Sequence, residues 1–158
     1  VFIADTDGEF GRYVPYQTVR PRPVVGTSGL MAEAWQWTFE RHGAPQLNGR
    51  FFRSADRFMT GPDWSAWAAV KAITQASIRA ESLEFQAIRE VIQNEELNMD
   101  TYKGFQSDFR PWNNQLRQNL LVSVNNAVIA RAPIDKFEHA VNDLDTLGID
   151  EPENKCVF

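Results

Sequence analysis

Two short apolar runs near the start of the chain end in polar loops. Val1–Ala4 is typical of a buried strand and stops at the acidic stretch Asp5–Glu9. This abrupt change fits the carboxyl end of a parallel strand. Val24–Val25 predicts a second, very short strand that runs into the polar loop Gly26–Gly29. The proline-rich stretch between them is predicted to be extended, because proline removes a hydrogen-bond donor and restricts the residue before it.

Helical spacing of apolar residues follows. A first helix is predicted from Met31 to about Arg41, with Gly43 as its C-terminal stop. His42, just before that glycine, is expected to complement the negative end of the helix. One more short helical turn is predicted between Gln46 and Phe52.

A better-defined helix is predicted to begin at Thr60. Thr60 is a good N-cap and Asp63 follows three residues later, which is the pattern of a capping box. The helix is expected to run to about Arg79, and its small residues suit close packing. Its predicted buried side consists of Ala66, Val70, Ile73 and Ser77.

Ser82 is predicted to cap a further helix, and the periodicity changes after Leu97. The buried side of this helix is expected to be Phe85, Ile88, Val91 and Ile92. Strands are then predicted at Met99–Tyr102, Leu120–Val124 and Val128–Ala132, the last two joined as a hairpin at Asn125–Asn126. One more helical stretch is expected near Asp135–Val141. Strands that alternate with helices over short loops indicate an α/β fold.

Composition narrows the class of protein. The 158 residues hold 16 Lys and Arg against 21 Asp and Glu, a net charge of −5, which argues against a nucleic-acid partner. No apolar run approaches the roughly 18–20 residues that a membrane span needs. The single cysteine, Cys156, cannot form an internal disulfide. The chain opens inside a predicted strand with no signal segment, so we expect a mature piece or a fragment of a longer protein.

Side chains that could carry out catalysis are scattered. The two histidines, His42 and His139, lie far apart, and no serine stands in a G-x-S-x-G turn, which weighs against nucleophilic catalysis. The stretch from Asp5 starts like a calcium loop, but the sixth and twelfth positions hold Phe10 and Tyr16 instead of glycine and glutamate. A solvated loop, or one that faces a polar ligand, is the favoured interpretation.

Two other groups of residues have both a structural and a functional interpretation. Trp64 and Trp67 share one helix face and could stack on a flat ligand, but core packing is favoured. Arg110 and the nearby Arg117 could grip a carboxylate through a forked contact, or pin a loop to the core, and the second interpretation is favoured. Asp143 and Asp145 are interpreted as surface charge.

Several strings, taken together in their order and spacing, resemble one family over nearly the whole chain, to about Glu153. The strings are Arg20–Leu30, Met59–Trp67, Phe109–Trp112, Gln115–Gln118 and Leu144–Gly148. The family that they resemble is the ABC-transporter substrate-binding proteins associated with pyrroloquinoline-quinone-dependent alcohol oxidation, which are similar to the type I periplasmic leucine/isoleucine/valine-binding proteins.

The resemblance implies an α/β fold in which this chain is the C-terminal part of a two-lobed type I periplasmic-binding-protein fold, with three-layer packing of sheet and flanking helices. Residues 1–58 would end one lobe, residues 59–118 would add helices and a strand to the other, and residues 119–158 would supply returning strands and a tail. The implied partners are a small-molecule solute, an ABC permease in the inner membrane and the missing N-terminal part of the same protein. The location would be periplasmic, with no cofactor and no catalysis.

The resemblance also selects two loops as the ligand site, since ligands of open α/β sheets bind outside the carboxyl ends of the strands. Thr27 and Ser28 would offer hydroxyls and backbone N–H groups to an anion, and Asp5 or Asp7 would pair with an amine, with Thr6 between them. Ordinary connecting loops are an equally good interpretation. Two rival functions stay open: a non-transport sensor or accessory binding protein on the same scaffold, and an enzyme that uses the acids near Asp5.

Overall fold

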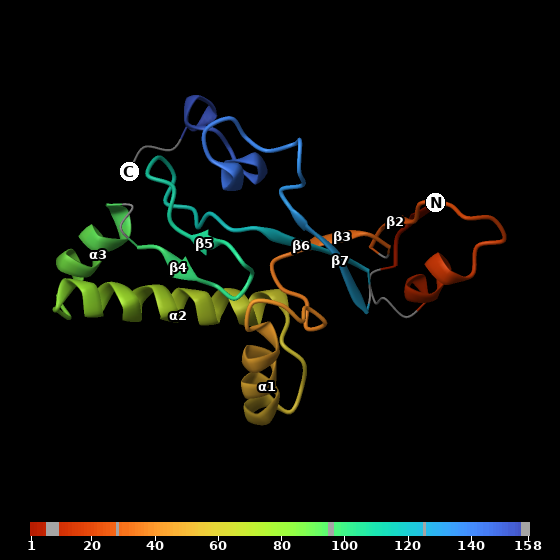
Figure 1. Ribbon diagram of the computed structural model, residues 1–158, viewed down its shortest axis with the longest axis horizontal. Helices are drawn as coiled ribbons and strands as arrows, with labels where there is room; N and C mark the ends of the chain where they lie inside the picture. Colours follow the sequence, from red (N-terminus) through yellow and green to blue (C-terminus); the bar gives the residue numbers. More distant parts are fainter. Residues whose placement is uncertain (6–9, 28, 95–96, 125, 156–158) are drawn as a thin grey trace.

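The computed structural model describes residues 1–5, 10–27, 29–94, 97–124 and 126–155, and these form a mixed α/β structure with small sheets (Figure 1). A parallel pair joins β1 to β2, an antiparallel sheet has the order β3-β6-β7, and a further antiparallel pair joins β4 to β5. The bounds of the strands are β1 Phe2–Ile3, β2 Val25–Gly26, β3 Met31–Glu33, β4 Met99–Asp100, β5 Gln106–Ser107, β6 Leu120–Val124 and β7 Ala127–Ala132.

Helices flank these sheets, and in Figure 1 α3 and β4 lie over the C-terminal half of the long helix α2. The α-helices are α1 Ala44–Ala55, α2 Gly61–Ala80 and α3 Phe85–Gln93. Short 3-10 turns occur at η1 Gly11–Tyr16, η2 Asp143–Leu147 and η3 Glu151–Glu153. The general prediction of a mixed α/β structure is therefore confirmed.

The predicted start of α2 is also confirmed. Thr60 and Asp63 form a capping box, in which the Asp63 carboxylate accepts a hydrogen bond of 2.9 Å from the Thr60 backbone N–H. Arg57 adds a forked ion pair to the same carboxylate, with its nearest N–O distance at 2.6 Å. The helix begins here because these contacts satisfy backbone donors that have no partner within the helix.

The buried face of α2 is not the predicted one. The prediction of Ala66, Val70, Ile73 and Ser77 is wrong, because Val70 is 66% exposed and Ile73 is 54% exposed. The core instead receives a stripe four residues apart: Trp64, Ala68, Ala72 and Ala76. Side chains as small as alanine let the backbones of α2 and the 97–101 segment approach closely, an effect that a ranking by side-chain hydrophobicity does not capture.

The predicted helix from Met31 to Arg41 is wrong as well. Met31–Glu33 forms β3 and pairs antiparallel with β6, whose backbone edge satisfies its hydrogen bonds. Gly43 does not end a helix but precedes α1, with a φ of 82° that favours glycine. His42 therefore lies before the start of α1 and complements no helix C-terminus. The short turn expected at Gln46–Phe52 belongs to the longer α1.

The later elements follow the sequence pattern more closely. The β6–β7 hairpin is confirmed, although Asn125 itself lies outside the described residues. The α3 helix forms, and its N-terminal Phe85 is 75% exposed rather than buried. The helix expected near Asp135–Val141 is absent from that described segment.

Two clusters of buried side chains form the core. In the first, the rings of Trp35 and Trp64 stack with centroids 6.3 Å apart, against Leu121 of β6. The second joins Ala72 and Ala76 of α2 to Leu97 and Met99. Trp67 stacks on Tyr102 at 5.5 Å. Core packing, the favoured interpretation for the two tryptophans of α2, is therefore what the structure shows.

Candidate functional site

The loops that follow β1 and β2 lie side by side. Because the two strands are parallel, their carboxyl ends meet at one edge. The backbone N–H of Thr27 donates to Ile3 O at 2.9 Å, and the backbone N–H of Asp5 donates to Thr27 Oγ1 at 2.5 Å. Asp5 and Thr27 are thus brought together.

Both side chains also have structural contacts. The Asp5 carboxylate accepts hydrogen bonds from the backbone N–H groups of Phe10, at 3.0 Å, and Gly11, at 2.6 Å, at the start of η1. The Thr27 hydroxyl lies 3.3 Å from Ile3 O, to which it donates. Thr6, Asp7 and Ser28, the other predicted ligand-binding residues, lie outside the described residues. The two loops therefore form a polar edge of the sheet. The polar groups of Asp5 and Thr27 at this edge also make hydrogen bonds within the protein that hold the loops in place.

The forked arginine contact exists, and the carboxylate that it grips belongs to the chain itself. Arg117 donates to both oxygens of Asp145, from Nε at 2.8 Å and from an Nη at 3.0 Å, and Arg110 Nε donates to Asp145 Oδ1 at 2.7 Å. Asp145 is 4% exposed, so its interpretation as surface charge is wrong. Burial raises the pKa of Asp145, but hydrogen bonds and charge from Arg117 and Arg110 outweigh burial and hold that pKa below its ordinary value. This network pins η2 to the loop before β6.

A buried lysine forms a second internal site. Lys103 is fully buried, and its Nζ lies 3.7 Å from the centroid of the Trp64 ring. Its three donors match three acceptors: Ala34 O at 3.1 Å, Gln118 Oε1 at 2.5 Å and Asn119 O at 2.7 Å. Burial lowers the pKa of Lys103 to about 7. The Lys103 ammonium therefore ties its own loop to Ala34 and to Gln118 and Asn119, the two residues just before β6.

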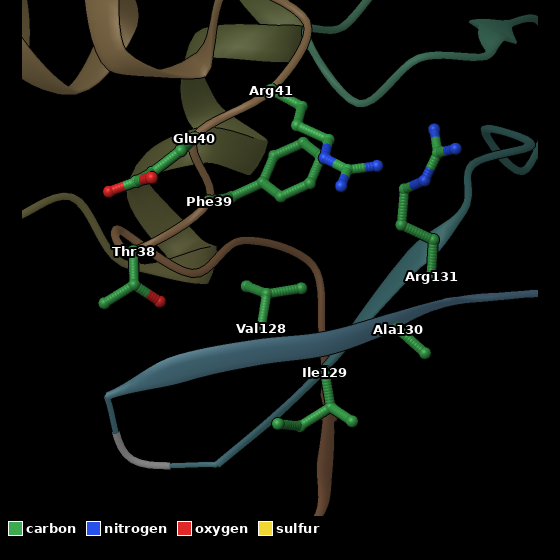
Figure 2. Close-up of a pocket in the computed structure, with 8 residues that line it drawn as sticks. All are labelled: Thr38, Phe39, Glu40, Arg41, Val128, Ile129, Ala130 and Arg131. Atoms are coloured by element: carbon green, nitrogen blue, oxygen red, sulfur yellow. The ribbon is translucent and has the colours of Figure 1, made fainter.

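Two adjoining cavities lie between the 37–41 loop and β7, and we call them together the β7 groove. One has a volume of about 340 Å³ and the other about 840 Å³, and Thr38, Phe39, Glu40 and Val128 line both. Arg41 and Arg131 line the smaller one (Figure 2). The sequence did not reveal this groove, because residues 37–41 were predicted to be part of a helix. Nothing in the sequence distinguished Arg131 except its place near the end of a predicted strand.

The described residues offer no assembled metal site, since they contain no group of three or more His, Cys, Asp or Glu side chains that could hold an ion. Across the same residues no helix is both long and apolar enough to span a membrane. His42 Nε2 lies 3.2 Å from an Nη of Arg131, and His139 Nε2 lies 3.5 Å from Asp150. Neither contact has the arrangement of a nucleophile and its base. Comparison with protein-family models, with curated proteins and with solved structures finds no match to this chain.

Proposed function

We propose that this chain is the C-terminal part of a periplasmic solute-binding protein that serves an ABC transporter. The observation that carries the proposal is the meeting of the Asp5 and Thr27 loops at the carboxyl ends of two parallel strands, joined by the 2.5 Å hydrogen bond from Asp5 N to Thr27 Oγ1. Ligands of α/β sheets bind at such an edge. The resemblance to the type I binding proteins supplies the remainder: a two-lobed fold divided at residues 1–58, 59–118 and 119–158.

The mechanism in this proposal is binding by lobe closure. A small solute lies between the lobes, where Thr27 and Ser28 face its anionic group and Asp5 or Asp7 faces an amine. The solute favours the closed population because it contacts both lobes at once. The permease then receives the loaded form, and no covalent bond is made or broken.

Exposed apolar side chains support the proposal that this chain is part of a longer protein. Val70, Ile73 and Ile78 on α2 are 66%, 54% and 70% exposed, and Phe2 on β1 is 77% exposed. Parallel strands are ordinarily covered on both faces. In the proposed parent protein, the N-terminal part of the chain covers these side chains.

The same exposed face of α2 favours a second candidate function. A sensor or accessory binding protein on this scaffold would use an apolar patch outside the cleft to contact its partner. The two candidates differ in what α2 contacts and in whether a solute is released to a permease.

A thermal-shift screen tests the proposal. The longer protein that contains this chain and the chain itself are screened with pyrroloquinoline quinone, small carboxylic acids and branched-chain amino acids. A ligand at 100 times its Kd adds about 2.7 kcal/mol of stability. A shift in the longer protein and none in the chain supports a cleft built from both parts. No shift in either protein, across the panel, overturns the transport proposal and favours the accessory one.

Variants locate the site. Asp7→Asn and Ser28→Ala in the longer protein are expected to reduce the ligand-induced shift. Asp135→Asn, at an exposed position of the 133–142 segment, is the matched control. Equal shifts in all three variants would mean that the two loops bind nothing.

A further inference from the structure

A β-bulge in β7 places two side chains of opposite character on one wall of the β7 groove. Val122 pairs with Ala130 and Ser123 pairs with Val128, so Ile129 is one extra residue in β7. In a regular strand, residues 128 and 131 would point to opposite faces. The extra residue brings Val128 and Arg131 to the same side, towards Phe39 and Arg41, whereas Ile129 points away (Figure 2). Bulges re-aim side chains in this way beside binding sites.

The re-aimed arginine meets a second arginine. Arg41 and Arg131 both line the smaller cavity, and Figure 2 shows their guanidinium groups at the same end of it. Arg131 donates to Lys103 O at 2.8 Å and contacts His42, but it pairs with no carboxylate in the described part of the chain. The Arg41 side chain has neither an ion pair nor a hydrogen bond to any described residue.

The remaining charged group does not neutralise the pair. The Glu40 carboxylate points away from both guanidinium groups in Figure 2. Two neighbouring like charges repel, and an anion between them would remove that repulsion. Arginine is also the side chain whose planar fork best matches a carboxylate.

The rest of the cavity has apolar and hydrogen-bonding walls. Phe39 is 5% exposed and, with Val128, forms an apolar surface beside the arginine pair. At the other end of the cavity, Thr38 Oγ1 is buried and has no hydrogen-bond partner among the described residues. A volume of about 340 Å³ matches a small organic ligand.

We propose that the β7 groove binds a small organic carboxylate with an apolar body, its carboxylate between Arg41 and Arg131 and its body against Phe39 and Val128. A polar group at the far end of the ligand would satisfy Thr38 Oγ1. This site is separate from the Asp5 and Thr27 loops. It does not depend on the transport proposal, because the groove lies entirely within this chain.

Isothermal titration calorimetry of the full 158-residue chain with phenylacetate tests the assignment. Phenylacetamide, which has the same shape without the charge, is titrated in parallel. We expect phenylacetate to bind and phenylacetamide to bind at least about tenfold more weakly, since charged hydrogen bonds are the stronger ones. Absence of phenylacetate binding, or equal affinity for both compounds, overturns the proposal.

Variants then separate the groove from the rest of the surface. Arg41→Ala removes a side chain with no partner in the described fold, so the fold should persist while phenylacetate affinity falls about tenfold or more. Arg22→Ala, at an exposed arginine outside the groove, is the control and should bind as the wild type does. Unchanged affinity in Arg41→Ala refutes the site.

A second pair of variants tests position rather than charge. Val128→Phe fills the cavity and should abolish phenylacetate binding, whereas Val141→Phe, at a position that is 88% exposed and lines neither cavity, should leave binding intact. Circular dichroism confirms that each variant is folded. Binding that survives in Val128→Phe, or that both variants lose equally while folded, places the ligand elsewhere.

Discussion

The buried network of Arg110, Arg117 and Asp145 ties η2 to the loop before β6, and the substitution Asp145→Asn tests how much it stabilises the fold. The side chains of Arg110 and Asp145 are each 4% exposed and that of Arg117 is 7% exposed. An asparagine keeps the shape of the carboxylate but removes its charge. Among the described residues, the two guanidinium groups then keep one nearby carboxylate, that of Asp108, at 3.3 Å from Arg117.

Removing one partner of a buried ion pair costs about 3–5 kcal/mol, because the remaining charge is left without compensation. The total stability of a domain is about 5–15 kcal/mol. For a chain of this length, 1 kcal/mol corresponds to about 2–4 °C in Tm, so we expect Asp145→Asn to lower Tm by about 6–20 °C. Urea unfolding and thermal circular dichroism measure both quantities.

The pH dependence of the same variant checks the cause. The folded-state pKa of Asp145 lies below its value in the unfolded chain, so its contribution is present above about pH 4 and is lost as the pH falls through the folded-state pKa. The stability difference between wild type and Asp145→Asn should therefore shrink in acid. Asp143→Asn, two residues away and exposed, is the control and should change stability by less than about 0.5 kcal/mol.

An apolar replacement of the whole network completes the test. Replacing a buried ionic cluster with well-packed apolar residues is often neutral. The triple variant Arg110→Met, Arg117→Met, Asp145→Leu should therefore recover more than half of the loss in Asp145→Asn. A loss below about 1 kcal/mol in Asp145→Asn would refute the reasoning, because the network would then not be what holds η2 in place.

Three further substitutions have defined outcomes. Gly148→Ala should destabilise the fold, because a Cβ at this position would overlap the Arg110 guanidinium. Thermal unfolding measures the loss, and a Tm equal to that of the wild type would contradict this placement of Arg110. Thr60→Ala should cost about 1 kcal/mol in urea unfolding through loss of the capping box, and Ser65→Ala, on the exposed side of the same helix, should cost less. Lys103→Met should flatten the pH dependence of stability above pH 7. Between about pH 7 and 10, Lys103 of the wild type is protonated in the unfolded chain but has released its proton in the folded chain, so stability rises with pH. An equal slope of unfolding free energy against pH in both proteins would contradict a lowered pKa for Lys103.

Local chemistry made several elements predictable from the sequence. The capping box at Thr60 and Asp63 involves residues three apart, and it forms whatever the rest of the chain does. The hairpin of β6 and β7 needs only two apolar runs and a short turn between them.

Only the tertiary structure decided which partners each segment found. The stretch from Met31 to about Arg41 has the apolar spacing of a helix, yet its first three residues became β3, because β6, about ninety residues further along the chain, offers an unpaired edge. Hydrophobicity selected the wrong face of α2, because close packing favours its alanines over its bulkier residues. Asp145 looks like surface charge until two distant arginines enclose it.

The β7 groove, likewise, was decided entirely by the tertiary structure. Arg41 and Arg131 are ninety positions apart, and Arg131 faces Arg41 only because one extra residue in β7 turns it to that side. A bulge is set by how two strands pair, and no pattern within either strand marks its place. The sequence by itself determined the start of α2 and the β6–β7 hairpin, since the contacts that form them are local. Which side chains converge was decided by long-range packing, because it depends on contacts between segments that the chain brings together only when folded.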